Sequence, residues 1–265
     1  MAISMTYRYS IFTKPYKTLS MDELGKKAAG MGFTAIEYPL REGYQVDLGD
    51  AENGMAELAK VMAKYGIAVS SIASATEEWA FAGCQAAGCK ILRIMAATDK
   101  KQRYLDWEKS YISYLESIEP LARKYGVTVG IQNHFGPMVS STMELKRIVD
   151  KFDPRYIAAV WDAAHSGLAG EQTEQALDII WDNLCLVNFK NAYYRRANGP
   201  EAPYAVYKPY FTLGRHGLAD YAKIAAYLKA RNYKGDICLP AEYSDEGLVD
   251  ELAPIELAYV KSLFE

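Results

Sequence analysis

Short runs of β-branched residues alternate with longer amphipathic segments along the chain, and this alternation restricts the possible folds more than any other feature. Each unit of one run and one segment takes about 33 residues, close to the size of a βαβ repeat. Such alternation is typical of parallel strands with helices between them. The strand candidates are YRYSI (7–11), TAIEY (34–38), IAVSSIA (67–73), KILRIMA (90–96), VTVGIQN (127–133), IAAVWD (157–162), LCLVNFK (184–190) and DICLPAE (236–242).

Eight strands that are each followed by a helix predict an α/β fold, the eight-fold (β/α)8 barrel. Ser20 and Glu23 have the spacing of a capping box at the start of the first helix. Gly66 suits the end of a helix predicted over 52–65, and a longer helix is predicted over 104–125. Because 265 residues suit one such barrel, we predict a single domain over residues 1–265.

Charge and composition narrow the classes of partner. A net charge of −3 without a basic stripe disfavours nucleic acids. No apolar run approaches the roughly 20 residues that cross a bilayer, and the N-terminal segment MAISMTYRYSIFTKPY has no long apolar stretch. Four cysteines are too few for a disulfide framework. We therefore expect a cytoplasmic protein with a small-molecule partner, no nucleic acid and no membrane. The oligomeric state stays open, with a homodimer as one option.

In barrels of this kind the reactive side chains lie at the carboxyl ends of the strands, where the βα loops converge. The last four predicted strands place Gln132, Asp162, Asn188 and Glu242 there. Other candidates at strand ends are Glu37, Arg93, Asn133, His134, His165 and Lys190. We therefore predict one functional site at this end of the barrel.

All three histidines of the chain, His134, His165 and His216, fall in the predicted loops at this end. For any one of them a hydrogen-bonded loop residue is an equally good interpretation, and the clustering favours function. Glu37 ends its strand between apolar residues, and a buried carboxylate there needs a partner. Substrate hydroxyls or an arginine such as Arg41 would serve, and we assign Glu37, Arg93, His134 and His216 to substrate binding.

The connection after the seventh strand, residues 191–213, is the longest in the chain, and such loops are usually functional or disordered. Its five tyrosines and one phenylalanine predict ordered packing over the barrel mouth, and the tyrosines could stack on a sugar ring. Residues 188–217 carry five basic side chains against the single acid Glu201. This excess favours a phosphate or carboxylate on the substrate, with Lys190 and Arg215 as binding residues. A solvated charged loop explains the same residues equally well.

Five segments carry a resemblance to a known family: GFTAIEY, IQNH, WDAAHSG, VNFKNA and, as the most specific, GRHGLADYAKIAAYLKARNYKGDICLPAEYS. They resemble the xylose isomerase-like TIM barrels, which include sugar phosphate isomerases and epimerases, inosose dehydratases and apurinic-site endonucleases. The resemblance covers nearly the whole chain. It implies a sugar or sugar phosphate as the small-molecule substrate.

In the epimerases of that family a divalent metal is held by Glu, Asp, His and Glu on strands five to eight. The resemblance places Gln132, Asp162, Asn188 and Glu242 at these positions, so two ligands are replaced by neutral amides. The exchange weakens binding of Mn or Zn, while amide oxygens can still coordinate Mg. The family pattern D-x-x-H adds His165 to the same pocket.

The family resemblance also implies a mechanism in which two Glu residues exchange a proton beside a carbonyl. Gln132 cannot act as a base, so catalysis is assigned to Glu242 and His165. The resulting prediction is an isomerase or epimerase with an altered metal centre. Two alternatives remain: a lyase similar to inosose dehydratase, and a carbohydrate-binding barrel without catalysis. The nuclease branch is disfavoured because its multi-zinc site needs more ligands than three histidines supply.

Overall fold

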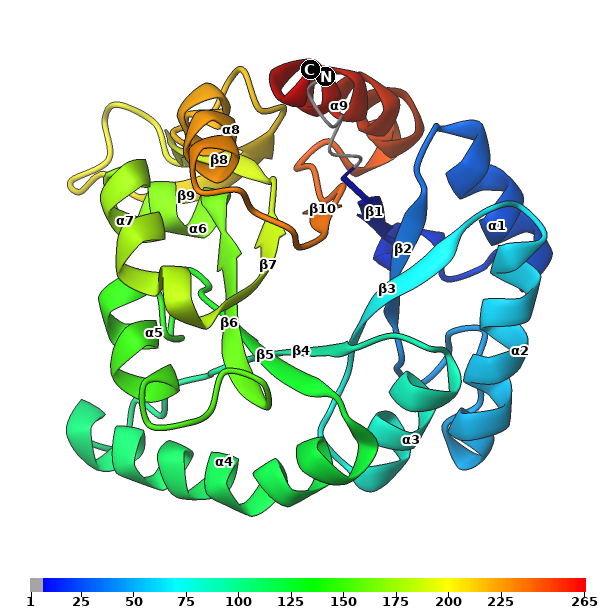
Figure 1. Cartoon of the computed structure of the whole chain (residues 1–265). Coiled ribbons are helices and arrows are strands. Elements are labelled where there is room, and N and C mark those ends of the chain that lie inside the picture. Colours follow the sequence, from blue (N-terminus) through cyan, green and yellow to red (C-terminus); the bar gives the residue numbers. More distant parts are fainter. Residues whose placement is uncertain (1–6) are drawn as a thin grey trace.

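The computed structural model describes residues 7–265, so the first six residues of the predicted domain lie outside it. Within these residues, eight parallel strands close into a barrel in the order β1-β10-β7-β6-β5-β4-β3-β2, which confirms the predicted (β/α)8 TIM barrel (Figure 1). The barrel strands are β1 (Tyr9–Phe12), β2 (Ala35–Pro39), β3 (Ala68–Ala73), β4 (Ile91–Met95), β5 (Thr128–Gln132), β6 (Ile157–Asp162), β7 (Leu184–Asn188) and β10 (Ile237–Leu239).

Helices form an outer ring around the strands (Figure 1). Two of them begin with a full capping box, at Ser20 with Glu23 and at Ser141 with Glu144, which satisfies backbone N–H groups of the first turn. The helices are α1 (Met21–Gly30), α2 (Ala51–Ala63), α3 (Glu78–Ala86), α4 (Tyr104–Tyr125), α5 (Thr142–Val149), α6 (Ala163–Leu168), α7 (Thr173–Ile180), α8 (Tyr221–Ala230) and α9 (Val249–Phe264). Short 3-10 turns include η1 (Lys14–Tyr16), directly after β1.

Two apolar clusters hold the barrel together. The larger one fills the space between the strands and the surrounding helices, with Trp161, Tyr38 and Phe81 among its largest fully buried side chains. A smaller cluster takes single residues from five barrel strands, which places it inside the barrel. Its buried members are Phe12, Ala73, Val160, Leu186 and Cys238.

The connection over residues 191–213 is ordered. It contains an antiparallel hairpin where the sequence predicts only a loop. Its strands are β8 (Asn191–Arg196) and β9 (Tyr207–Thr212), and the hairpin packs against α6 (Figure 1). The buried carboxylate of Glu256 on α9 accepts hydrogen bonds from the Gly214 backbone at 2.9 and 3.0 Å and from the Tyr221 hydroxyl at 2.9 Å. The chain after the hairpin is thereby fastened to the last helix.

Among residues 7–265, no helix is both long and apolar enough to cross a membrane. Cys84, Cys89 and Cys238 are buried, Cys185 is partly buried, and all four are free thiols.

Candidate active site

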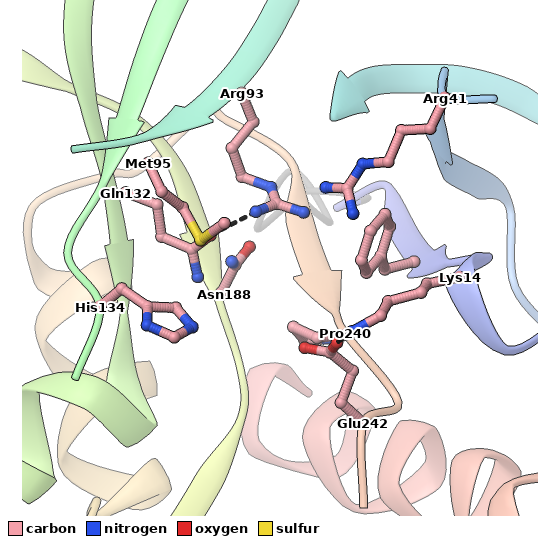
Figure 2. Close-up of a pocket in the computed structure, with 10 residues that line it drawn as sticks. Lys14, Arg41, Arg93, Met95, Gln132, His134, Asn188, Pro240 and Glu242 are labelled. Atoms are coloured by element: carbon pink, nitrogen blue, oxygen red, sulfur yellow. Dashed lines mark hydrogen bonds and ion pairs between the residues drawn. The ribbon is translucent and has the colours of Figure 1, made fainter. Parts of the chain in front are cut away.

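A cavity at the carboxyl ends of the barrel strands is the candidate active site. It is a narrow cavity of about 70 Å³, below the roughly 300–1,000 Å³ usual for small-molecule sites. The polar side chains that line it come from segments far apart in the sequence (Figure 2). They are Lys14, Arg41, Arg93, Gln132, His134, Asn188 and Glu242.

A buried ion pair joins Glu37 at the end of β2 to Arg93 on β4. Arg93 donates from Nε to Glu37 Oε1 at 2.7 Å and from Nη2 to Oε2 at 2.9 Å. Glu37 is fully buried, and Ser71 donates a further hydrogen bond to it at 3.1 Å. Burial opposes ionisation of the guanidinium, yet Glu37 more than offsets this and raises the pKa of Arg93. An arginine thus pairs with Glu37, as one of the two alternatives from sequence has it, but this arginine is Arg93 and not the example Arg41.

The ion pair continues into a row of hydrogen bonds across β5, β6 and β7. Arg93 Nη1 donates to Gln132 Oε1, and Gln132 Nε2 donates to Asp162 Oδ2 at 2.7 Å. Asn188 Nδ2 also donates to Asp162 Oδ2, at 3.3 Å. Burial raises the pKa of Asp162. Asp162 lies beneath the cavity and fixes the orientation of the two amides that line it.

Glu242 lies between two ammonium groups at the opposite wall. Lys14 Nζ is 2.6 Å from Glu242 Oε1, and Lys190 Nζ is 2.7 Å from Oε2. Burial of the carboxyl group opposes ionisation, but Lys190 and Lys14 together lower the pKa of Glu242 far below its ordinary value. A carboxylate so stabilised is a weak proton acceptor.

His134 is a largely buried imidazole in the wall of the cavity. Its Nδ1 lies 2.9 Å from the Phe135 carbonyl oxygen, which can only accept, so Nδ1 carries the proton and Nε2 keeps its lone pair. Burial lowers the pKa of His134 below 6.5, with a further contribution from Lys190. Figure 2 shows the ring beside Gln132 and Asn188, on a different side of the cavity from Lys14 and Glu242.

His165 is fully buried behind His134 and does not line the cavity. Its ring packs against His134, Phe135 and Phe211, with the two imidazole centroids 4.1 Å apart. Neither of its ring nitrogens has a hydrogen-bond partner among the described residues. His165 therefore packs against His134. Its catalytic role stays a prediction.

With this geometry in place, a family model described as "Xylose isomerase-like TIM barrel" matches residues 26–263. The chain belongs to the xylose isomerase-like TIM barrel family. Among curated relatives, the inosose dehydratase of Bacillus velezensis is 26% identical over 133 residues, 48% of this chain and 45% of the relative. The matched part thus spans about half the length of the curated relatives.

Solved structures of the same fold include two epimerases. The 3-keto-D-glucoside 4-epimerase from E. coli matches with a TM-score of 0.72 and 14% identity over 97% of this chain and 100% of that one. An L-ribulose 3-epimerase matches with a TM-score of 0.74 and 16% identity over 98% of this chain and 95% of that one. At these identities the likeness concerns the fold.

This member of the xylose isomerase-like TIM barrel family does not have a donor set that fits the implied divalent-metal centre. The side-chain oxygen of Gln132 accepts from Arg93, and the amide nitrogens of Gln132 and Asn188 face Asp162. Amide nitrogens and ammonium groups are not metal ligands, and two ammonium groups already neutralise Glu242. Within residues 7–265, no group of three or more His, Cys, Asp or Glu side chains is placed to hold a metal ion.

The basic residues of the long connection do not gather at the cavity. Arg195 lies over the Tyr210 ring at 4.4 Å, and Arg215 lies over the Tyr259 ring at 3.8 Å. His216 is exposed and does not line the cavity. Only Lys190 of this cluster reaches the site, where it contacts Glu242. The substrate-binding roles of Arg215 and His216 remain predictions without support from this arrangement.

Two residues that line the cavity, Lys14 and Arg41, are not among the site residues predicted from sequence. Lys14 lies two positions after the end of the first strand, so the rule that places site residues at strand ends also predicts Lys14. Arg41 lies two residues after the end of β2, and from sequence it is predicted only as a possible partner for Glu37. In the structure its guanidinium forms no hydrogen bond or ion pair with any residue of 7–265, and it lies 6.0 Å from the Phe12 ring centroid.

Replacing His165 by Leu is expected to keep turnover and to weaken the pH dependence of stability. Burial places the pKa of His165 well below 6.5, so its stabilising effect is present above the unfolded pKa and is lost as pH falls below about 6.5. Urea unfolding at a series of pH values between about 7 and 5.5 measures the slope. His216→Gln, at an exposed histidine, is the control. Lost turnover in the folded His165→Leu variant would contradict the packing role.

Proposed function

We propose that this chain is a sugar isomerase that moves a proton at the carbon beside a carbonyl group, with a histidine as base and no divalent metal. The observation that carries the proposal is the neutral His134, whose Nε2 is free while Nδ1 is held by the Phe135 carbonyl. Membership of a family of xylose isomerase-like barrels supports sugar-like substrates. The polar side chains that converge on the cavity from distant segments support a small polar ligand.

The side chains around His134 divide the remaining tasks. Lys14 lines the cavity and provides an ammonium group that can stabilise an oxyanion. Lys190, with 7% of its side chain exposed, holds Glu242 from the other side and keeps it ionised. Gln132 and Arg93 are fixed by the row of hydrogen bonds and present donors to substrate hydroxyls.

In an aldose–ketose isomerisation, His134 Nε2 takes the proton from the hydroxyl-bearing carbon next to the carbonyl. The carbonyl oxygen becomes an enediolate oxygen, which Lys14 stabilises. The hydroxyl proton on the carbon that lost its hydrogen then passes to that oxygen, and the imidazolium gives a proton to the former carbonyl carbon. One base suffices because the proton leaves and returns on the same face.

A dehydration is the second candidate, and the curated relatives named inosose dehydratase favour it. The first step is the same removal of a proton beside a carbonyl by His134. The hydroxyl group on the next carbon then leaves as water with the proton of the imidazolium, and a carbon–carbon double bond remains. The two candidates thus share a base and differ in product mass.

Incubation in D₂O with a panel of aldoses, ketoses and inososes tests the proposal. For an isomerisation, deuterium is expected on the former carbonyl carbon, because the imidazolium proton exchanges with solvent before it is returned. For a dehydration, deuterium is expected beside the carbonyl of recovered substrate, through reversal of the proton removal. Both are detected by NMR and mass spectrometry. A product of unchanged formula supports isomerisation, whereas a product lighter by one water supports dehydration. Sugar binding with neither exchange nor product over the whole panel would contradict both and favour a carbohydrate-binding barrel.

Removal of metal ions provides a separate prediction. We expect dialysis against EDTA to leave turnover unchanged, because the Gln132 and Asn188 amides and the two lysines at Glu242 do not form a metal site. Turnover is measured before and after dialysis, and again after addition of Mn²⁺, Mg²⁺ or Zn²⁺. Loss of activity that one of these ions restores would contradict the metal-free mechanism.

A further inference from the structure

The half-buried guanidinium of Arg41 at the cavity rim has no directly bound anionic partner among residues 7–265. It lines the cavity, and within residues 7–265 it forms neither a hydrogen bond nor an ion pair. Burial lowers the pKa of Arg41, and the positive charge of Arg93 lowers it further. Arg41 and Arg93 lie over the same Phe12 ring, and the charges of Glu37 and Glu242 only partly offset the burial of Arg41 and its repulsion by Arg93.

The charges of the site indicate how much negative charge a ligand beside Arg41 would need to carry. Four cationic side chains and three carboxylates line or directly support the cavity. Arg93 pairs with Glu37, the two lysines share Glu242, and Asp162 is held by amides. Arg41 is the cation left over, so a single negative charge balances the site.

We infer that the substrate carries a carboxylate and that Arg41 binds it. This inference rests on the proposed function for the reaction and names the class of its substrate: a sugar acid with a carbonyl group. The planar guanidinium matches a carboxylate in a bidentate pair. The Phe12 ring supports both arginines from one side, and the partly buried setting reduces competition from water.

A carboxylate fits this charge balance better than a phosphate. A phosphate monoester carries about −1.5 to −2 at pH 7, which exceeds the one uncompensated cation. Two of the basic residues within 188–217, on which the prediction of a phosphate or carboxylate from sequence rests, stack on tyrosine rings and do not line the cavity: Arg195 and Arg215.

Binding of matched sugars tests the inference without any need for turnover. The full chain is titrated by calorimetry with D-glucuronate and D-galacturonate, with D-glucose and D-galactose, and with D-glucose 6-phosphate. The same titrations are made with Arg41→Gln, with Arg41→Lys, and with Arg215→Gln as the control at the other predicted anion-binding arginine. Thermal unfolding of each variant verifies that it is folded.

We expect at least one uronate to bind the wild type about tenfold or more tightly than its neutral partner, the effect of one charge-assisted contact. Arg41→Gln removes this preference, Arg41→Lys retains part of it, and Arg215→Gln leaves it intact. Equal binding of acid and neutral sugar, a stronger preference for the phosphate, or a preference that survives in Arg41→Gln overturns the inference. Lack of deuterium exchange with uronate binding intact would instead count against the proposed reaction alone.

Discussion

Replacing His134 by Gln is expected to lower the turnover number by about two to four orders of magnitude, the usual contribution of a general base. Glutamine keeps a donor for the Phe135 carbonyl and lacks the basic lone pair of Nε2. The deuterium-exchange rate should fall by the same factor, because both measure removal of a proton from carbon. His216→Gln makes the same chemical change at an exposed histidine outside the cavity and serves as control. A His134→Gln variant with nearly normal turnover would exclude His134 as the base.

The pH profile gives a second measure of the same role. His134 acts in its neutral form, and burial together with Lys190 lowers its pKa below 6.5. The rate should therefore be constant as pH falls from about 7 to 6.5 and decline only at lower pH. Replacing Lys190 by Gln removes one of the two causes, so the acid limb should move to higher pH. An unchanged limb in this variant would contradict the assignment to His134.

The architecture follows from sequence because it depends on local patterns. Each of the eight predicted strands overlaps an observed barrel strand, and the capping box at Ser20 and Glu23 is present. The hairpin of β8 and β9 is different. Its strands pack against α6 and leave tyrosines such as Tyr194 and Tyr207 exposed, so the segment lacks the alternation of buried and exposed residues that identifies strands.

The site could be located from sequence, but the pairing of its side chains could not. Strand ends correctly bring Gln132, Asn188 and Glu242 to one cavity. Which acid meets which base depends on the direction of side chains inside a closed barrel. Glu37 on β2 and Arg93 on β4 are 56 positions apart, and they meet only because both side chains point into the barrel. From sequence, Arg41 serves as an example of an arginine that could pair with Glu37, but in the structure Arg93 forms this pair.

Replacing Arg93 by Ala is expected to lower the free energy of unfolding by about 3–5 kcal/mol, because it leaves a buried carboxylate without its counter-ion. Glu37 is fully buried, and the hydrogen bond from Ser71 cannot neutralise it. The substitution also removes the donor that holds Gln132. Chemical denaturation followed by circular dichroism measures the loss.

A paired substitution separates loss of the charge pair from loss of packing. Arg93→Met with Glu37→Gln keeps most of the side-chain volume and removes both charges, so it should recover much of the stability lost in Arg93→Ala. It also remains measurable if Arg93→Ala alone fails to fold. Arg155→Ala, which breaks an exposed pair with Asp153, is the matched control and should change stability little. If Arg93→Ala were no more destabilising than this control, the ion pair would not be what keeps Glu37 inside the barrel. In that case the row of hydrogen bonds from Gln132 to Asp162 would have to be held in place by the amides alone.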